Sequence, residues 1–458
     1  MPVDKQEIKK ENGEILRLFW PVLIENALAV TIGMVSAMMV SGVGDFAVSG
    51  VSLVDTFNFV VISAFQAIAV GATVIVAQKI GAKKTSDAGE TAYQSIVFCV
   101  ILATLLGAAT FFGNRHILNF LYGAAAANVL DAGETYFRFS SISYPFLGLF
   151  AACNGIMRAG GNTRTPMIVS AVANIVNISI AFVLILLGYG VLGVSIAMLV
   201  ARVMSGLFSF FMLRKGTRGV VLPGGKPRLT AEILNPVLRV GIPSGIDSMF
   251  FTGARVMMTV FMSSMGTSAI HAHAIGNSLS GFIFLPGNAF AVISVTLVGQ
   301  AFGAGLFQKI RRLMKKMIFF SSVSLTVMVI LLLLLLDPLM SLYSPSVETA
   351  ATVRTLILTF SILAPFMWSF AFCVPAMLRA CGDAKATMYI SVCSLLALRV
   401  LGSWFFGIYL DMGVLGVWMG MYADWIGRGI SFSIRAFTNA WKKNMGATPG
   451  ASPGAKIE

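Results

Sequence analysis

Charged side chains are scarce in this chain of 458 residues. Asp, Glu, Lys and Arg make up 11% of it, and hydrophobic residues make up 57%. Charged residues are about a quarter of a typical globular chain. A soluble protein of this size could not cover its surface with so few charges, and a disordered chain combines high charge with low hydrophobicity. The composition therefore indicates an integral membrane protein.

Cysteine and histidine are also few, with five and three residues. The cysteines lie in or beside apolar stretches, and no CxxC pair or Cys/His ligand spacing occurs. This pattern predicts neither a disulfide framework nor a zinc site. The chain also lacks a GxxxxGK[ST] loop, which excludes that kind of ATP site. We expect no metal and no cofactor.

A formal net charge of +14 could suggest a nucleic-acid partner. The basic residues, however, lie in short loops between apolar stretches, and no separate basic domain is present to hold a phosphate backbone. Cytoplasmic loops of membrane proteins are rich in Lys and Arg for topological reasons. We therefore expect membrane lipid around the protein and no nucleic acid.

Apolar stretches of the required length recur along the whole chain. A hydrocarbon core of about 30 Å needs roughly 20 apolar residues per helix. The sequence predicts an all-α membrane protein with twelve transmembrane helices, at approximately 15–41, 47–77, 91–113, 132–157, 165–187, 190–213, 238–264, 268–301, 317–337, 351–378, 387–409 and 414–436.

The basic residues orient these helices. With the N-terminus inside, the predicted external segments contain only Arg115 and Arg354, and most other basic residues fall in cytoplasmic segments. This asymmetry predicts a multi-pass protein of the plasma or inner membrane with both termini in the cytoplasm. The predicted organisation is an N-terminal arm (1–14), an N-lobe with helices 1–6 (15–213), a cytoplasmic linker (214–237), a C-lobe with helices 7–12 (238–436) and a cytoplasmic tail (437–458), which we expect to be disordered from Met445.

The chain repeats itself at an offset of about 222 residues. The repeat keeps its register through Pro, Gly, Arg and Gln, which chance similarity between apolar helices would not do. The equivalent segments are Pro21 and Glu25 with Pro243 and Asp247, Gly44 and Ala47 with Gly266 and Ala269, Gln78–Ala82 with Gln300–Ala304, Met157–Asn162 with Leu378–Asp383, and Gly190–Val194 with Gly413–Val417.

The duplicated unit has six helices, so both copies have the same orientation in the membrane. Parallel repeats of this kind are related by a pseudo-twofold axis along the membrane normal. Two equal bundles joined by a loop can rock around a central cleft, which suits a transporter that works by alternating access. An ion channel more often closes its pore by oligomerisation, and we expect this chain to act as a monomer.

The chain resembles the multidrug and toxic compound extrusion (MATE) family over residues 12–440, because it contains several motifs of that family in the same order. The resemblance implies two six-helix lobes that export lipophilic, usually cationic, organic compounds, driven by an inward flow of protons or sodium ions. The motifs are the prolines of the first and seventh helices, Val298-Gly299-Gln300 with Gly303, Leu378-Arg379-Ala380 with Gly382-Asp383, and His271-Ala272-His273-Ala274-Ile275 with Asn277.

The sequence departs from this family where the coupling acids are found. Many members have an aspartate in the first helix, where this chain has Val35-Ser36-Ala37, and a second acid would fall near Ala181. Another branch has acids in the seventh and tenth helices, at the positions of Phe251 and Trp368. None of these acids can be carried over, so the coupling ion, proton or sodium, is left open.

Other ionisable residues lie inside the predicted helices. A charge at the bilayer centre costs a few kcal/mol, so each needs a partner, a water-filled cavity or a function. Glu25 and Asp55 lie about two to three turns inside the first and second helices, on the order of 12–15 Å. A carboxylate at that depth can exchange a proton and attract an organic cation. We predict that Glu25 and Asp55 couple transport to the proton or cation.

Asp247 and Arg255 lie in the seventh helix and are predicted to bind substrate or to form ion pairs. Their side chains point about 80° apart around the helix, so a direct pair between them is not expected. The alternative is an internal pair of Asp247 with Arg255 or Arg399. Arg255 should be held by an acid or bind an anionic group.

Three further features have a local interpretation beside a functional one. Asn154 and Asn177 resemble polar residues of the family's N-lobe cavity, but hydrogen bonds between helices would explain them equally well. Asp424 and Arg428 are spaced i,i+4 and are expected to form a local pair.

Two other functions are compatible with parts of the sequence. A flippase for a lipid-linked saccharide or another amphipathic lipid would use a cationic cavity, and Arg138, Arg202, Arg255 and Arg399 keep that alternative open. A membrane-bound enzyme could use His271 or His273 as a general base. No catalytic partner is evident near them, and catalysis gives no reason for two matched halves, so we expect no enzyme and no catalytic residue.

Overall fold

The computed structural model describes residues 5–123, 125–217, 219–225 and 229–447. These residues form helices joined by short loops, and no strand occurs among them beyond one isolated bridge between Thr217 and Val220. The chain divides into two compact units, Met1–Gly245 and Ile246–Glu458. Each unit is described by itself.

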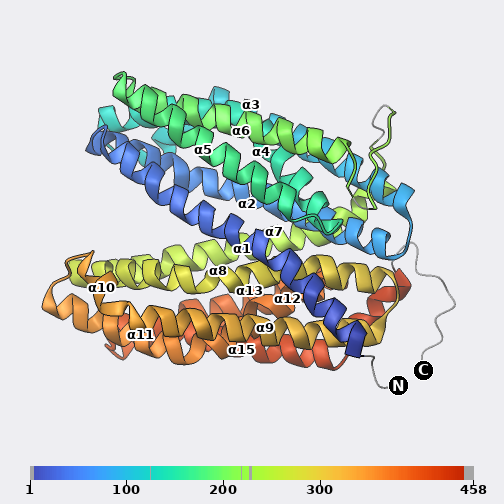
Figure 1. Ribbon diagram of the computed structural model, residues 1–458. Helices are drawn as coiled ribbons and strands as arrows, with labels where there is room; N and C mark the ends of the chain where they lie inside the picture. Colours follow the sequence, from blue (N-terminus) through green and yellow to red (C-terminus); the bar gives the residue numbers. More distant parts are fainter. Residues whose placement is uncertain (1–4, 124, 218, 226–228, 448–458) are drawn as a thin grey trace. The chain divides into compact units, whose positions relative to one another are not determined.

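The first unit contains six long helices (Figure 1, blue to green). Each agrees with a predicted membrane span, although α1 and α3 begin well before the apolar stretch that predicted them. The helices are α1 (Lys5–Ser41), α2 (Asp45–Gly81), α3 (Thr85–Tyr122), α4 (Ala127–Ala159), α5 (Arg164–Leu186) and α6 (Gly190–Arg214).

The seventh predicted span is α7 (Ala231–Ser263), and the division between the units falls inside it. The next two spans are α8 (Thr267–Gly303) and α9 (Phe307–Leu334), followed by the short α10 (Leu336–Ser341). The predicted lobe boundaries at 213 and 238 stay predictions, because two compact units do not show where the chain leaves the membrane.

The last three spans are less regular. The tenth consists of α11 (Val347–Trp368), the π-helical turn η1 (Ser369–Cys373) and α12 (Val374–Ala380). The eleventh consists of α13 (Ala384–Ser394), the π-helical turn η2 (Leu395–Val400), α14 (Leu401–Trp404) and the π-helical turn η3 (Phe405–Tyr409). The twelfth is α15 (Gly413–Phe437), which is followed by the 3₁₀ helix η4 (Ala440–Ala447). The twelve predicted spans are thus confirmed.

Nine spans of the described residues are long and apolar enough to cross a membrane by length and composition alone. The other three are α4, α7 and α15. These three carry the internal charges discussed below, such as Arg158, Asp247 and Asp424. Charged residues inside a helix count against it in a test by length and composition.

The internal repeat extends to the backbone. Gly161 and Gly382 end the fourth and tenth spans at equivalent positions, with φ angles of +75° and +78°. Gly190 and Gly413 begin the sixth and twelfth spans with φ angles of +51° and +60°. A residue with a Cβ atom rarely adopts such angles. The glycines of the repeat are therefore the turn residues that give both units the same connections.

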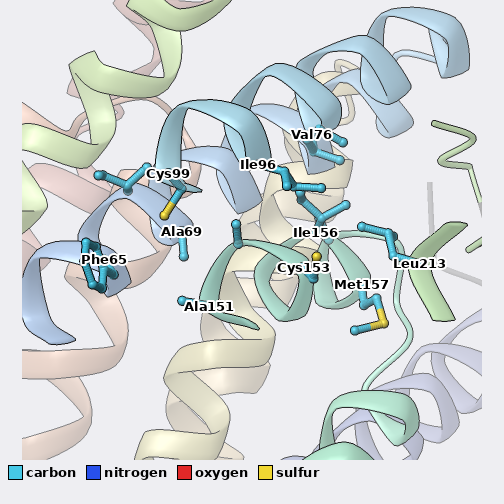
Figure 2. Close-up of a cluster of buried hydrophobic side chains, with 14 of the residues drawn as sticks. Phe65, Ala69, Val76, Ile96, Cys99, Ala151, Cys153, Ile156, Met157 and Leu213 are labelled. Atoms are coloured by element: carbon cyan, nitrogen blue, oxygen red, sulfur yellow. The ribbon is translucent and has the colours of Figure 1, made fainter. Parts of the chain in front are cut away.

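The core of the first unit lies where α4 packs against α2 and α3. Phe65, Ile96, Cys153 and Met157 belong to one cluster of buried apolar side chains (Figure 2). Helices approach closely at small residues: a Cβ atom at Gly107 would lie 2.7 Å from the backbone oxygen of Ser141. Small residues at such crossings allow close packing of membrane helices, where water exclusion gives little driving force.

The core of the second unit is more aromatic. The rings of Trp368 and Phe372 are stacked 4.8 Å apart, and Trp425 lies edge-on to Phe372. A Cβ atom at Gly287 would lie 2.3 Å from the Trp368 ring, so α8 leaves room for this indole by having no side chain there. Stacked and edge-on aromatic rings therefore fill this part of the second unit's core.

The described part of the predicted linker packs on the first unit. The Thr230 amide donates a 3.0 Å hydrogen bond to Gln94 Oε1 on α3, and Val220 is fully buried. A Cβ atom at Gly89 would lie 2.0 Å from the backbone oxygen of Val221. The described part of the linker is therefore held along α3.

The beginning of the predicted tail is ordered. Trp441 in η4 is fully buried, and its Nε1 donates a 3.0 Å hydrogen bond to the Ala436 oxygen. The expectation of disorder from Met445 is not met up to Ala447, because η4 extends to that residue. The remainder of the tail, 448–458, lies outside the described residues.

Candidate functional site

Neutral donors on two helices hold the carboxylate of Asp55. Its Oδ1 accepts a 3.2 Å hydrogen bond from Asn58 Nδ2, one turn further along α2, and a 3.1 Å bond from the Tyr136 hydroxyl on α4. Asn58 and Tyr136 are buried, whereas Asp55 is exposed. Asp55 lies about 15 Å along α2 from its first residue. The carboxylate is therefore fixed on its protein side and open on the other.

The network continues along one face of α4. The Tyr144 hydroxyl donates a 2.7 Å hydrogen bond to Asn58 Oδ1, and Asn58 Nδ2 also donates to Ser140 Oγ at 3.2 Å. Tyr136, Ser140 and Tyr144 follow one another at a spacing of four, which places them on one face of a helix. The sequence analysis missed these residues, although their spacing was a usable signal.

Arg202 on α6 interacts electrostatically with Asp55 but does not contact it. Its Nη1 donates a 2.8 Å hydrogen bond to Ser143 Oγ, and its charge acts on Asp55 from a distance. No Lys or Arg nitrogen of the described residues forms an ion pair with Asp55. The positive charge of Arg202 therefore attracts the Asp55 carboxylate from a distance and leaves its oxygen atoms free of direct contact with a cation.

Glu25 has a different environment. Its Oε1 accepts a 2.6 Å hydrogen bond from Arg158 Nη2, at the end of α4, and a 3.2 Å bond from Ser170 Oγ on α5. Glu25 is buried, with 8% of its surface exposed. The pair joins α1 to the end of α4.

Asp247 has the equivalent contact in the second unit. Its Oδ2 accepts a 3.1 Å hydrogen bond from Arg379 Nη1, at the end of α12. The partner is therefore neither Arg255 nor Arg399, the two arginines considered for this acid. The repeat had aligned Arg158 with Arg379 and Glu25 with Asp247. What it did not reveal is that each acid contacts the arginine of its own copy.

Arg255 is exposed, and no acid of the described residues lies within ion-pair distance of it. The expected acid partner is thus not found. Its positive charge is instead near enough to His273 and Arg399 to disfavour a positive charge on either side chain. The remaining possibility from the sequence, an anionic group bound from outside the chain, stays a prediction.

Asp424 lies at the centre of a buried cluster in the second unit. It accepts hydrogen bonds of 2.9 Å from Arg428 Nη2 and 2.7 Å from Ser394 Oγ. Arg399 Nε lies 3.5 Å from Asp424 Oδ2. The predicted local pair of Asp424 with Arg428 is confirmed, and Arg399 on η2 joins it as a third member.

Asn154 and Asn177 lie apart from the Asp55 network. Asn154 is buried on α4, and its Oδ1 accepts a 3.2 Å hydrogen bond from Ser209 Oγ on α6. This contact agrees with the interhelical alternative. Asn177 on α5 is partly buried, and its side chain forms no hydrogen bond with the described residues. A role of either residue in binding substrate stays a prediction.

The outer charges form a matched set in the two units. Arg115 at the end of α3 lies 3.0 Å from Glu134 in α4, and Arg354 in α11 pairs with Asp337 in α10. The first pair joins α3 to α4, and the second joins α10 to α11. The base comes first in one unit and the acid comes first in the other.

One member of each pair occupies an equivalent position. Pro145 in α4 corresponds to Pro365 in α11, and the same offset carries Glu134 onto Arg354. It carries Arg115 onto Leu335, two residues before Asp337. Both units therefore have an ion pair near this position, with an acid in α4 and a base in α11. Arg138 also pairs with Glu134, at 2.5 Å.

The two histidines considered as a general base have no acidic partner among the described residues. His273 Nδ1 accepts a 3.1 Å hydrogen bond from Trp418 Nε1, and the two rings meet edge-on. His271 is exposed. His273 Nδ1 is therefore already occupied by an indole donor.

The matched ion pairs and turn glycines indicate two copies of one unit, and the copies include residues 21–183 and 243–405, respectively. The family model MatE matches these two segments. The chain belongs to the MatE family. The resemblance inferred from the sequence is thereby confirmed, and the membrane protein is a transporter by its family.

Similar proteins cover this chain almost completely. The uncharacterized transporter YisQ of Bacillus subtilis is 28% identical, with 95% of this chain and 96% of that protein covered. A probable multidrug resistance protein NorM of Thermotoga maritima is 25% identical, over 96% of this chain and 95% of that one.

A solved structure has the same fold. An outward-facing multidrug resistance MATE family transporter matches with a TM-score of 0.87 at 20% identity, covering 94% of this chain and 96% of that chain. This likeness supports the fold of twelve transmembrane helices in two six-helix lobes. It does not bear on the side chains of the Asp55 network.

Proposed function

We propose that the protein is a secondary antiporter that exports lipophilic, mainly cationic organic compounds in exchange for protons or sodium ions. The two lobes would provide alternating access to the cargo. One observation carries the proposal: Asp55 is an intramembrane carboxylate that is held by neutral donors and forms no ion pair with the described residues.

The chemistry of this carboxylate suits exchange. Hydrogen bonds from Asn58 and Tyr136 use Oδ1 and fix its orientation, and they leave the negative charge uncompensated by contact. A proton, a sodium ion or an organic cation would therefore compete for the same oxygen atoms. Competition for one group is what an antiporter requires, because occupation by one ligand releases the other.

Glu25 and Asp247 are less suited to this exchange. Each is already in contact with an arginine, and protonation would leave that guanidinium as an unpaired charge in a partly buried place. We therefore assign the coupling first to Asp55. Glu25 stays a predicted coupling residue that could accept a proton only if Arg158 moved away.

The relatives support this proposal in outline. NorM of Thermotoga maritima is described as a probable multidrug resistance protein. By analogy we infer export of several organic compounds across the plasma membrane, by a monomer with both termini in the cytoplasm.

The test uses purified protein in liposomes. Ethidium transport should follow an imposed proton or sodium gradient, and Asp55→Asn should abolish the coupling while the protein still folds. Asp45→Asn is the matched control, since Asp45 is exposed at the start of the same helix. Ethidium transport by Asp55→Asn that still depends on the gradient would show that another group couples the ion.

A further inference from the structure

Two buried arginines in the second unit share one acid. Arg399 and Arg428 are 2% and 3% exposed, and Asp424, which both approach, is fully buried. Arginine stays protonated in proteins, so this cluster has one more positive than negative charge. A buried charge in a membrane helix needs a partner or a function.

Several donors of this cluster are unused. Arg399 Nη1, Arg428 Nε and Trp425 Nε1 are buried and have no hydrogen-bond acceptor among the described residues. Arg399 Nε has only the 3.5 Å ion-pair contact with Asp424 Oδ2 and forms no hydrogen bond. Three donors without an acceptor on two neighbouring spans are an unusual concentration, since nearly all buried polar groups are paired. The shortage is one of acceptors and of negative charge.

Aromatic rings explain only part of this arrangement. The guanidinium carbons of Arg399 and Arg428 lie 4.9 Å and 5.8 Å from the centre of the Phe251 ring, and Arg428 lies 4.7 Å from Phe372. Such cation–π contacts stabilise a positive charge. They do not supply an acceptor to N–H groups in the plane of the guanidinium.

The rings also mark the side from which a ligand could enter. Phe251 and Phe372 are only partly buried, unlike the arginines that they cover. Arg255, one turn after Phe251 on α7, is exposed, and its charge acts on Arg399. An anion near Arg255 would thus be attracted toward the cluster.

The backbone is irregular at the same place. Arg399 lies in η2 and Phe372 lies in η1, both π-helical turns inside longer helices. Such turns often occur at functional sites, because they cost helix stability and re-aim side chains.

We propose that Arg399 and Arg428 form an anion-binding site that takes the carboxylate of an aromatic organic compound, with its ring against Phe251 and Phe372. Phe251 has to turn aside for the carboxylate to reach the arginines. The same donors would suit a small inorganic anion such as chloride. The identity of the carboxylate as cargo rests on the proposed transport function, whereas the binding site itself does not.

A purely structural cluster would behave differently from a binding site. If Asp424, Arg399 and Arg428 only hold α15 against η2, Asp424→Asn destabilises the protein and creates no affinity for anions. If they form an anion site, the same change removes the competing internal carboxylate. Anion affinity should then rise several-fold, and the added anion should restore part of the lost melting temperature.

The experiment measures binding to the purified full-length protein in detergent by titration calorimetry. The probes are 1-naphthoate, its neutral analogue 1-naphthamide, and sodium chloride, in a chloride-free buffer. We expect saturable binding of naphthoate and at least tenfold weaker binding of naphthamide. Arg399→Gln should weaken naphthoate binding at least tenfold, and Arg399→Lys, which keeps the charge, should lie between. Arg354→Gln, an exposed arginine of the same unit, is the control and should bind like the parent.

Each outcome either supports or overturns the proposed anion site. Binding of naphthoate that depends on Arg399 supports an aromatic carboxylate as ligand, and binding of chloride alone supports the site with an inorganic anion. Equal binding of naphthoate and naphthamide, unchanged binding in folded Arg399→Lys and Arg399→Gln, or no response to either anion overturns the proposal. Ethidium transport in liposomes is measured separately, so failure of the anion site and failure of the antiporter are distinguishable.

Discussion

The two units have the same backbone plan and different polar groups between their helices. In the first unit, hydroxyl and amide groups hold one side of an exposed acid, with Asp55 bound by Asn58 and Tyr136. In the second unit, two arginines share Asp424 among stacked aromatic rings. Duplication therefore preserved the helices and turns, while the polar chemistry inside each copy changed independently.

What the copies share lies at the helix ends. Glu25 with Arg158 and Asp247 with Arg379 are equivalent ion pairs, each tying the first span of a unit to the end of its fourth. The fold depends on such connections, and function depends on the side chains placed between them. Mutations of the ion pairs at helix ends and mutations of the polar groups between the helices should therefore change stability by different amounts.

The largest effect should come from the second unit's interior. Asp424→Ala would leave two buried arginines without a carboxylate, and breaking a buried pair costs about 3–5 kcal/mol. Asp55→Ala should cost about 1 kcal/mol, because the acid is exposed and loses only neutral hydrogen bonds. Unfolding of the purified protein in detergent measures both. Equal losses would contradict the contrast between the two interiors.

The equivalent ion pairs should rank next. Arg158→Ala and Arg379→Ala should each cost roughly 2–4 kcal/mol, less than the fully buried cluster, because both guanidinium side chains are 20% exposed. Arg164→Ala, an exposed arginine at the start of α5, is the control with little expected effect. A large difference between Arg158→Ala and Arg379→Ala would show that the two pairs are equivalent in position only.

A smaller loss is expected from the aromatic packing. Gly287→Ala places a Cβ atom 2.3 Å from the Trp368 ring, and overpacking of this kind costs about 1–3 kcal/mol. Gly281→Ala, on the same helix, meets nothing within 4 Å and should be neutral or slightly stabilising. Melting temperatures of the two variants give the comparison. If they melt alike, Trp368 has room to move and the second unit is less tightly packed than its contacts suggest.

The outer ion pairs should matter least. Arg354 and Asp337 are largely exposed, and exposed pairs contribute less than about 1 kcal/mol. The double exchange of Arg354→Asp with Asp337→Arg should therefore be nearly neutral, and each single change should shift the melting temperature only slightly. A loss larger than that of Gly287→Ala would mean that the outer ends are held more firmly than exposed charges allow.

The twelve spans and the repeat could be predicted because they depend on local properties. A run of apolar residues has to be long enough to cross the membrane, and a glycine such as Gly161 or Gly382 is needed for a positive φ angle. Both signals are visible without knowing what any segment touches.

The partners of the internal charges could not be predicted in this way. Arg158 is 133 residues from Glu25, and Arg379 is 132 residues from Asp247. Only the packing of helices brings these groups together. The sequence therefore suggested Arg255, on the same helix as Asp247, or Arg399 as its partner, and gave no indication of Arg379. The π-helical turns that carry Arg399 and Phe372 likewise leave no mark in the pattern of apolar residues.

The reversed charges of the outer pairs bear on how such proteins are compared. Glu134 and Arg354 are opposite in sign at equivalent positions, and each pairs with a charge of the other sign on the preceding helix. An alignment of the two halves that scores each position by similarity counts Glu134 and Arg354 as a mismatch. A comparison of contacts counts them as agreement, since the charges of each pair sum to zero in both halves. The likeness of the two outer ends is thus visible in the contacts that they make and not in the residue type at either position.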